Sequence, residues 1–294
     1  MRLPPRRDAL LIAVAVLGVS TSGPLIAATA APALAIAFWR NAMAVAVIGP
    51  VALLRNRMEF RALSRRQWTV CVLAGLLLAG HFATWVPSVK LTSVASATAL
   101  VATQPIWAAV FARAFGRRIR PGAWAGMGVG VLGAALVTGA DFSISTRAVV
   151  GDGLAVAGGV LAAAYVTAGG VSRRTVSTTV YTTVAYSVCA LVLLLVCLVS
   201  GQRLGGYDGG TWTRLVALTV AAQLIGHSLI NRVLSTTSAT VVSLAILFEV
   251  PGAAMVASVF LHQVPSPVAL PGLAVLLAGL AIVVRSGGRA VPLE

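Results

Sequence analysis

Glu249 is the most unusual residue in this sequence, because it is an acid inside a long apolar run and Pro251 follows it closely. If residues 238–261 form a helix, the carboxyl lies about ten residues, or roughly 15 Å, into it. A carboxylate at such a depth in a membrane is costly unless it is protonated, paired or hydrated. We therefore expect Glu249 to bind a proton or a substrate. A structural carboxyl that bonds a neighbouring helix is the alternative.

Two Gly-His pairs, Gly80-His81 and Gly226-His227, lie 146 positions apart. A histidine inside a membrane protein can line a polar cavity, or it can hydrogen-bond across helices beside a close glycine contact. Asn231 follows His227 by one helical turn and is expected to share its helix face. We predict that both histidines and Asn231 contact a substrate, and simple helix packing remains the alternative.

Pro105 and Pro251 are separated by the same 146 positions. A proline in a helix interior removes a backbone hydrogen bond and frees a carbonyl group. Interrupted helices at matching places in two halves of a chain point to the binding site of a transporter. We predict a helix bend at each proline, although a kink that serves only packing would look the same in sequence.

Four further residues are candidates for the walls of such a site, and one arginine has two possible roles. The wall candidates are Trp85, Gln104, Trp107 and Tyr165. Aromatic belts at the membrane interface are an alternative explanation for the aromatic residues among them. Arg40 lies within an apolar run, where it could extend its charge to the membrane surface or meet an anionic substrate or Glu249.

The composition identifies the solvent that surrounds these residues. The 294 residues are 59% hydrophobic and 10% charged, whereas soluble domains have about 25% charged residues. The surface must therefore face lipid. The net charge of +15 comes from basic residues between apolar runs, so it indicates membrane topology and not nucleic-acid binding. The three cysteines lack metal-ligand spacing, and we expect no metal, no cofactor and no enzymatic activity.

Ten runs are long and apolar enough to cross the membrane, which takes about 20 residues. They are residues 9–29, 33–54, 68–87, 94–115, 123–139, 153–171, 179–200, 212–230, 238–261 and 268–284. Gly126 and Gly130 in the fifth run have the G-x-x-x-G spacing that predicts close helix packing. Ser20–Pro24 is expected to soften the first helix, with hydroxyls toward a cavity.

The basic residues predict the orientation. If the N-terminus is cytoplasmic, seventeen of the 22 lysines and arginines fall on the cytoplasmic side and four on the other. Such a bias is typical of the cytoplasmic face. We predict ten crossings of a bacterial inner membrane with both termini in the cytoplasm.

The 146-residue shift extends beyond the histidines and prolines, so the chain contains a repeat. It also relates Pro121 to Pro267, Gly126 to Gly272 and Gly133 to Gly279, whereas Trp68 matches Trp212 at a shift of 144. One small insertion therefore separates the two frames. Because five spans are an odd number, the second copy enters the membrane from the opposite side. We predict an all-α membrane protein with two inverted five-helix repeats, residues 1–145 and 146–294.

The motifs resemble those of a known family. Gly80–Trp85, Leu91–Ala95 and Pro105–Trp107 in the first half, and Gly226–Asn231, Ser238–Ser243 and Glu249–Gly252 in the second, look like an EamA-type member of the drug/metabolite transporter (DMT) superfamily. The resemblance implies that helices 1, 3, 4, 6, 8 and 9 line a cavity. It departs at Gly116-Arg117 and His262-Gln263, where the family usually has a Gly-Glu pair.

These observations predict a secondary transporter that moves small amino-acid-like or amphipathic metabolites, by export, through alternating access. Glu249 is the candidate for proton coupling. A passive facilitator of a small neutral solute and a non-transporting membrane scaffold are the alternatives. The expected partners are the substrate and the lipid bilayer, with no nucleic acid, and the protein is a monomer or a homodimer.

Overall fold

The computed structural model describes residues 6–116, 118–142, 145–172, 175–233 and 245–287, and these residues form helices and connections without any strand. The helices of the first half are α1 (Arg6–Ser20), α2 (Ser22–Ala28), α3 (Ala33–Arg55), α4 (Arg57–Ala62), α5 (Arg65–Leu91), α6 (Val94–Val101), α7 (Gln104–Ala114) and α8 (Pro121–Phe142). Those of the second half are α9 (Thr146–Ser172), α10 (Thr178–Val199), α11 (Gly209–Leu218), the π-helix η1 (Thr219–His227), α12 (Ser228–Val233), α14 (Glu249–Leu261) and α15 (Ala269–Gly287). The prediction of an all-α protein is confirmed for the described residues.

Nine helical segments of the described chain are long and apolar enough to cross a membrane. Three of them combine successive helices, namely α1 with α2, α6 with α7, and α11 with η1 and the start of α12. The predicted run over 238–261 is represented by the shorter apolar helix α14, because residues 238–244 lie outside the described part of the chain. The structure therefore supports nine of the ten predicted spans by length and composition.

The outer surface of the bundle is apolar. Leu54, Val199 and Phe260 are all more than 70% exposed, and many other large apolar side chains face outward with them. Soluble monomers rarely expose such extended apolar surface, whereas hydrocarbon accepts it. The protein is a multi-pass membrane protein.

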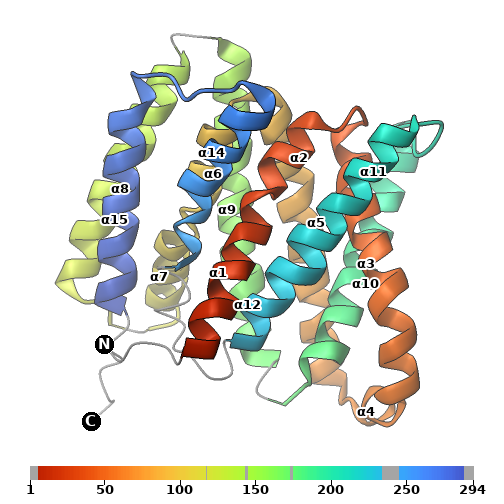
Figure 1. Cartoon of the computed structure of the whole chain (residues 1–294). Coiled ribbons are helices and arrows are strands. Elements are labelled where there is room, and N and C mark those ends of the chain that lie inside the picture. The colour runs from red at the N-terminus through yellow and green to blue at the C-terminus, as the bar shows by residue number, and fades with distance from the viewer. Residues whose placement is uncertain (1–5, 117, 143–144, 173–174, 234–244, 288–294) are drawn as a thin grey trace.

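The pair α8 and α15 stands at one edge of the bundle, where the two helices run side by side (Figure 1). Glycines allow this contact. A Cβ atom built on Gly133 would lie 2.2 Å from the backbone nitrogen of Leu276, and one on Gly279 would lie 2.2 Å from that of Gly130. Small residues let helix backbones approach closely in membranes. The packing role predicted for Gly126 and Gly130 is confirmed, since both face α15 or its neighbours.

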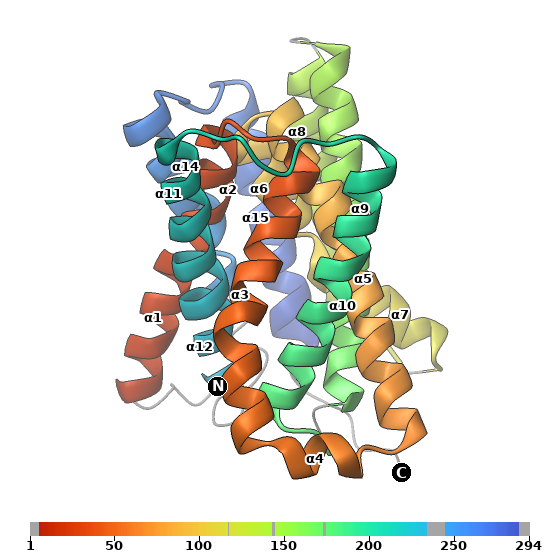
Figure 2. The same cartoon turned by 90° about the vertical axis from the view of Figure 1, so that its right-hand side faces the viewer.

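The remaining helices enclose the main core. Helix α5 packs along α9, α10 packs on both α3 and α5, and α1 packs on η1 (Figure 2). The largest apolar cluster lies among α3, α5, α10 and the α11–η1 segment, with Phe82, Tyr186 and Leu218 among its buried members. This arrangement brings the middle of α3 against η1, although the two are far apart along the chain.

Two spans of the described chain are interrupted, and a turn precedes a third apolar helix. Thr21 separates α1 from α2, Ala102 and Thr103 separate α6 from α7, and a turn at residues 247–248 precedes α14. Thr21 and Thr103 each donate a hydrogen bond of 2.7 Å to the carbonyl oxygen three residues earlier. The same two carbonyl oxygens also accept the backbone N–H of Thr21 and Thr103, so each threonine closes the turn with two bonds.

Pro105 and Pro251 lie in the first turns of α7 and α14, directly after the interruptions. A bend at each proline, inside a continuous helix, was predicted from the sequence. In the structure each proline instead lies at the start of a new helix. A proline in the first turn loses no helical hydrogen bond, because the N–H at that position has no acceptor within the helix. The break therefore precedes each proline instead of occurring at it.

Gly116 and His262, the first residues of the two pairs at which the chain departs from the family pattern, share a backbone conformation. Both residues, which are related by the 146-residue shift, follow the end of a helix with positive φ values of 82° and 55°. Glycine adopts this conformation without strain, whereas a residue with a Cβ atom pays a steric penalty. The two halves thus end these helices in the same way with different residues.

Candidate functional site

Arg40 of α3 is the centre of the most polar region inside the bundle, and its side chain is 0% exposed. Its Nε and Nη2 atoms both donate to Oε1 of Gln223 in η1, at 3.2 and 2.7 Å. Its Nη1 atom donates to Oγ of Ser22 in α2 at 3.3 Å. The Cζ atom lies 4.3 Å from the ring centroid of Phe82, which is the distance of a cation–π contact. The side chain therefore does not extend to the membrane surface.

Gln223, Phe82 and the neighbouring Tyr186 were not predicted from the sequence, whereas Ser22 belongs to the stretch Ser20–Pro24, whose hydroxyls were expected to face a cavity. The Tyr186 side chain hydrogen-bonds that of Gln223. The sequence could have indicated Gln223. It is an amide in an apolar run, and an amide that faces other helices requires polar partners. A buried arginine in the second span requires acceptors for the same reason.

Glu249 lies at the start of α14, partly buried, and it is close enough to Arg40 for their charges to interact. The two side chains do not form an ion pair within the described structure, where the arginine has only neutral acceptors. A carboxylate in the first turn of a helix is stabilised by the helix dipole. Glu249 is thus placed beside the arginine and available for protonation or for another partner.

His81 of α5 is held by a backbone group of α9. Its Nδ1 atom is 2.9 Å from the carbonyl oxygen of Gly158. Since a carbonyl oxygen only accepts, Nδ1 carries the proton, and in the neutral ring Nε2 remains an acceptor. The imidazole stacks on Trp85 with a centroid distance of 5.8 Å and an angle of 8° between the rings. These contacts are those of the helix-packing alternative, and the predicted contact of His81 with a substrate stays a prediction.

Trp85 is buried, and its Nε1 donor has no hydrogen-bond partner in the described structure. The hydroxyl groups of Ser20 and Thr98 are likewise buried without partners there. Ser20 ends α1 next to the interruption at Thr21, and Thr98 belongs to α6. Buried donors without partners are uncommon in folded proteins and call for an explanation.

His227 ends η1, and its side chain is exposed. It nevertheless lies within electrostatic range of Arg40 and His81. The preceding Gly226 makes a close contact with α1, where an added Cβ atom would lie 2.7 Å from Cγ1 of Val19. The second Gly-His pair therefore combines close helix packing with a histidine that borders open space.

The other predicted residues occupy different places. Tyr165 stacks on Tyr181 at 6.2 Å and interacts electrostatically with Tyr186, so it borders the Arg40 region. Trp107 donates from Nε1 to the Thr103 hydroxyl at 3.1 Å, at the interruption between α6 and α7. Gln104 starts α7 beside it. Asn231 lies in α12, and its side chain is outside the described part of the structure.

A small cavity of about 170 Å³ approaches the Arg40 region from the half of the bundle in which α10 begins. Its lining residues are Ile48, Thr178, Thr179, Thr182, Tyr186, Leu224 and Ser228. Most of them carry hydroxyl groups. Because Tyr186 also bonds Gln223, this cavity ends one side chain away from the partner of Arg40.

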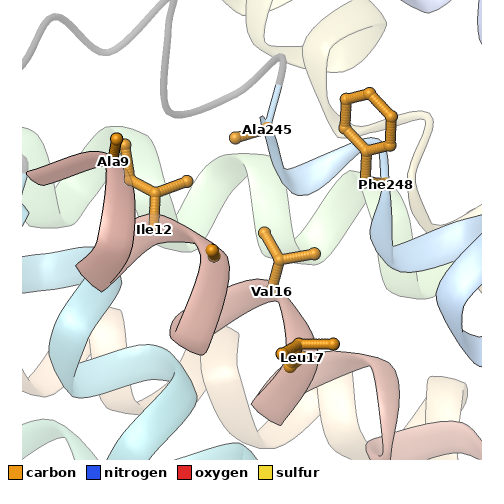
Figure 3. Close-up of a pocket in the computed structure, with 7 residues that line it drawn as sticks. Ala9, Ile12, Val16, Leu17, Ala245 and Phe248 are labelled. Atoms are coloured by element: carbon orange, nitrogen blue, oxygen red, sulfur yellow. The ribbon is translucent and has the colours of Figure 1, made fainter. Parts of the chain in front are cut away.

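A larger groove of about 390 Å³ lies between α1 and the segment that leads into α14 (Figure 3). Its lining is apolar throughout and consists of Ala9, Ile12, Ala13, Val16, Leu17, Ala245 and Phe248. Leu17 and Phe248 are 67% and 68% exposed, so the groove opens outward. Such a lining suits lipid chains, and the polar region around Arg40 is the better candidate for a substrate site.

Metal or cofactor chemistry has no obvious centre in the described part of this fold. Within those residues, no three or more His, Cys, Asp and Glu side chains are grouped so that they could hold a metal ion. Cys71, Cys189 and Cys197 are buried free thiols.

Comparisons with known proteins agree with this description. The model of the EamA-like transporter family matches the chain twice, over residues 7–139 and 149–285. A solved crystal structure, described only as that of a protein, is similar at 20% sequence identity with a TM-score of 0.65, covering 94% of this chain and 96% of the other. At that identity the similarity shows the fold alone. No curated protein matches the sequence.

Proposed function

Because the chain belongs to the EamA-like transporter family of the DMT superfamily, we propose that it is a secondary transporter that moves small metabolites across the membrane by alternating access. The family consists of membrane transporters and not typically of enzymes. The proposed cargo is an amino-acid-like or amphipathic compound, and the proposed direction is export.

The buried polar region around Arg40 is the observation that carries this proposal. A guanidinium in the interior of an apolar bundle is costly, and a protein that served only as a scaffold would gain more stability from apolar packing. Spans interrupted beside this region, at Thr21 and before Glu249, add backbone groups of the kind that transporters use at their binding sites.

We further propose ten spans arranged as two inverted repeats, residues 1–145 and 146–294. The double match of the family model supports this division. The packing agrees with it, because α8 packs on its proposed mate α15 and α3 packs on its mate α10. Rocking of one repeat against the other would then open the polar region to alternate sides of the membrane.

The proposed location is a bacterial inner membrane with both termini in the cytoplasm. Helix α1 begins and α15 ends at the same end of the bundle, and the arginine-rich helix α4 lies at that end as well (Figures 1 and 2). Arginine and lysine mark the cytoplasmic side of membrane proteins, which supports this orientation.

Transport can be tested with a mixture of possible cargoes. Proteoliposomes loaded with a bacterial extract of small metabolites should release a subset of compounds faster than protein-free liposomes, as measured by mass spectrometry. Equal release from both preparations for every compound would contradict the transporter assignment.

We propose that Glu249 couples transport to the proton gradient. The variant Glu249→Gln keeps the size of the side chain and removes its titration, so release should lose its dependence on a pH gradient. Arg214→Gln, which alters an exposed residue of α11, is the control and should behave as the wild type. Unchanged pH dependence in Glu249→Gln would eliminate this role, and release that persists after collapse of the gradient would indicate a passive facilitator.

A further inference from the structure

We propose that the transported molecule carries a carboxylate, and that Arg40 binds this group at a position that Gln223 occupies in the present conformation. The inference rests on the proposed function and specifies the class of its substrate. Three features of the molecule support it: the charge of Arg40, the hydrogen bonds of its guanidinium, and the N–H group of Trp85 that has no partner in the described structure.

Within the described residues, Arg40 is a cation without a counter-ion. Among the acidic side chains that the structure describes, Glu249 is the one that interacts electrostatically with Arg40, and it forms no ion pair with Arg40 there. The residues outside the described ranges between α12 and α14 contain no Asp or Glu. A buried guanidinium is normally paired with an anion, so an external anion would complete this site.

The bonds to Gln223 occupy the edge of the guanidinium that a carboxylate would bind. The Nε and Nη2 atoms form one edge of the guanidinium fork, and both donate to the same amide oxygen. A carboxylate binds this edge with two parallel bonds, which are stronger because both partners are charged. Gln223 therefore acts as a neutral substitute for an anion. The guanidinium of Arg40 also has donors to spare. It carries five N–H groups, and it donates two hydrogen bonds to Gln223 and one to Ser22.

The rest of the region suits a molecule with one negative charge and an apolar body. Phe82 covers one face of the guanidinium, and the buried Trp85 nearby on α5 has an N–H group without a partner in the described structure. The other basic residue at this end of α5, Lys90, donates to the carbonyl oxygens of Ala27 and Thr29 and is therefore occupied. One available cation matches a monocarboxylate better than a doubly charged phosphate.

The η1 helix offers a way for Gln223 to leave. Bonds of a π-helix span five residues, and such segments are rare and often mark functional positions. The hydroxyl-lined cavity ends at Tyr186, the other partner of Gln223. A carboxylate that entered through this cavity would reach the amide first and then replace it on Arg40.

Binding to the purified full-length protein in detergent provides the test. The probes are isovalerate and phenylacetate, each compared with its carboxamide of the same shape, and binding is measured by equilibrium dialysis. We expect the wild type to bind a carboxylate at least about tenfold more tightly than the matched amide, which is the effect of replacing neutral by charged hydrogen bonds. Arg40→Gln should abolish this preference, and Arg214→Gln should retain it.

Two more variants keep the proposal testable if Arg40→Gln does not fold. Gln223→Glu supplies a permanent carboxylate to Arg40, so it should raise the thermal unfolding midpoint and weaken carboxylate binding by about tenfold or more. Glu249→Gln removes the only competing acid among the described residues and should strengthen carboxylate binding. A structural role of Arg40 alone predicts the change in unfolding midpoint for Gln223→Glu without any change in selectivity.

Equal binding of carboxylates and amides, including no binding of either, would overturn the proposal. So would a carboxylate preference that Gln223→Glu leaves intact. Release of amides but not of carboxylates from loaded proteoliposomes would keep the transporter assignment and exclude an anionic cargo. Carboxylate binding without release of any metabolite would instead retain the site and contradict the proposed function.

Discussion

The interface between α5 and α9 and the interface between α1 and η1 carry the same Gly-His pair, yet they differ in structure. In the first, α5 is a regular α-helix, and His81 bonds the Gly158 carbonyl across the contact. In the second, the helix is π-wound, Gly226 packs against Val19, and His227 is exposed. The same Gly-His pair has therefore placed one histidine in a contact between helices and left the other exposed beside a close contact.

The cause of this difference can be found in the spacing of the repeat. Trp68 precedes Gly80 by 12 positions, whereas their mates Trp212 and Gly226 are 14 apart. The two additional residues fall between Trp212 and Gly226, in the segment that comprises the end of α11 and most of η1. Helices absorb insertions by local π-winding, which changes the direction of the side chains that follow. Gln223, which bonds Arg40, lies within this π-wound segment.

The largest expected effect comes from adding a methyl group to each interface. A Cβ atom on Gly18 of α1 would lie 2.6 Å from the carbonyl oxygen of Ala221, whereas one on Gly80 would meet the end of the Leu161 side chain at 3.2 Å. Backbone cannot move as a side chain end can. We expect Gly18→Ala to destabilise the protein by about 3 kcal/mol and Gly80→Ala by less than about 1 kcal/mol. Thermal unfolding of the two variants in detergent measures the difference, and equal losses would contradict it.

Gln223 is a polar residue in the second half whose mate in the first half, at the 146-residue shift, is the apolar Leu77. The substitution Gln223→Leu makes the second half resemble the first and removes the acceptor of two Arg40 hydrogen bonds. We expect a loss of about 2 kcal/mol despite the more apolar side chain, since hydrogen bonds to charged groups contribute about 1.5–3 kcal/mol. Leu77→Ile is a control for altered packing at the matching position. A neutral or stabilising Gln223→Leu would show that Arg40 does not depend on this amide.

The two histidines should respond differently to truncation. His81→Ala removes a hydrogen bond to Gly158 and a stacking contact with Trp85, so we expect a loss of about 1 kcal/mol. His227→Ala removes an exposed side chain and should leave the unfolding temperature nearly unchanged. If His227→Ala proved the more destabilising change, the description of His227 as an exposed side chain without a structural role would be wrong.

The smallest effect is expected at the helix starts that lead into the two interfaces. Ser64 caps α5 and Asp208, its mate at a shift of 144, caps α11. Bonds from the side chain and backbone of Thr211 lower the pKa of Asp208. The stabilisation by this cap is therefore present at neutral pH and is lost as the pH falls through that lowered value. At neutral pH Asp208→Ala should unfold at a lower temperature than the wild type, and this difference should disappear as the pH falls. The difference between Ser64→Ala and the wild type should not depend on the protonation of Asp208.

Much of the fold could be predicted from the sequence. The apolar runs gave the membrane class and nine spans that the structure supports, and the motifs around Gly80 and Glu249 gave the family. Such features belong to short stretches of chain, because hydrocarbon thickness fixes span length and each span must satisfy its own backbone. The break before each proline was harder to place, since Pro105 and Pro251 are compatible with either a bend or a helix start.

The candidate site depended on contacts between distant segments. Glu249 and Arg40 were recognised as unusual residues, but the sequence left open whether Arg40 would face the membrane surface or the interior. Gln223 lies 183 positions from Arg40 and came into contact with it only through the packing of η1 on α3 and α1. Hydropathy determined which segments enter the lipid. Tertiary packing decided which polar groups meet there, because in hydrocarbon each of them must find its partner on another helix.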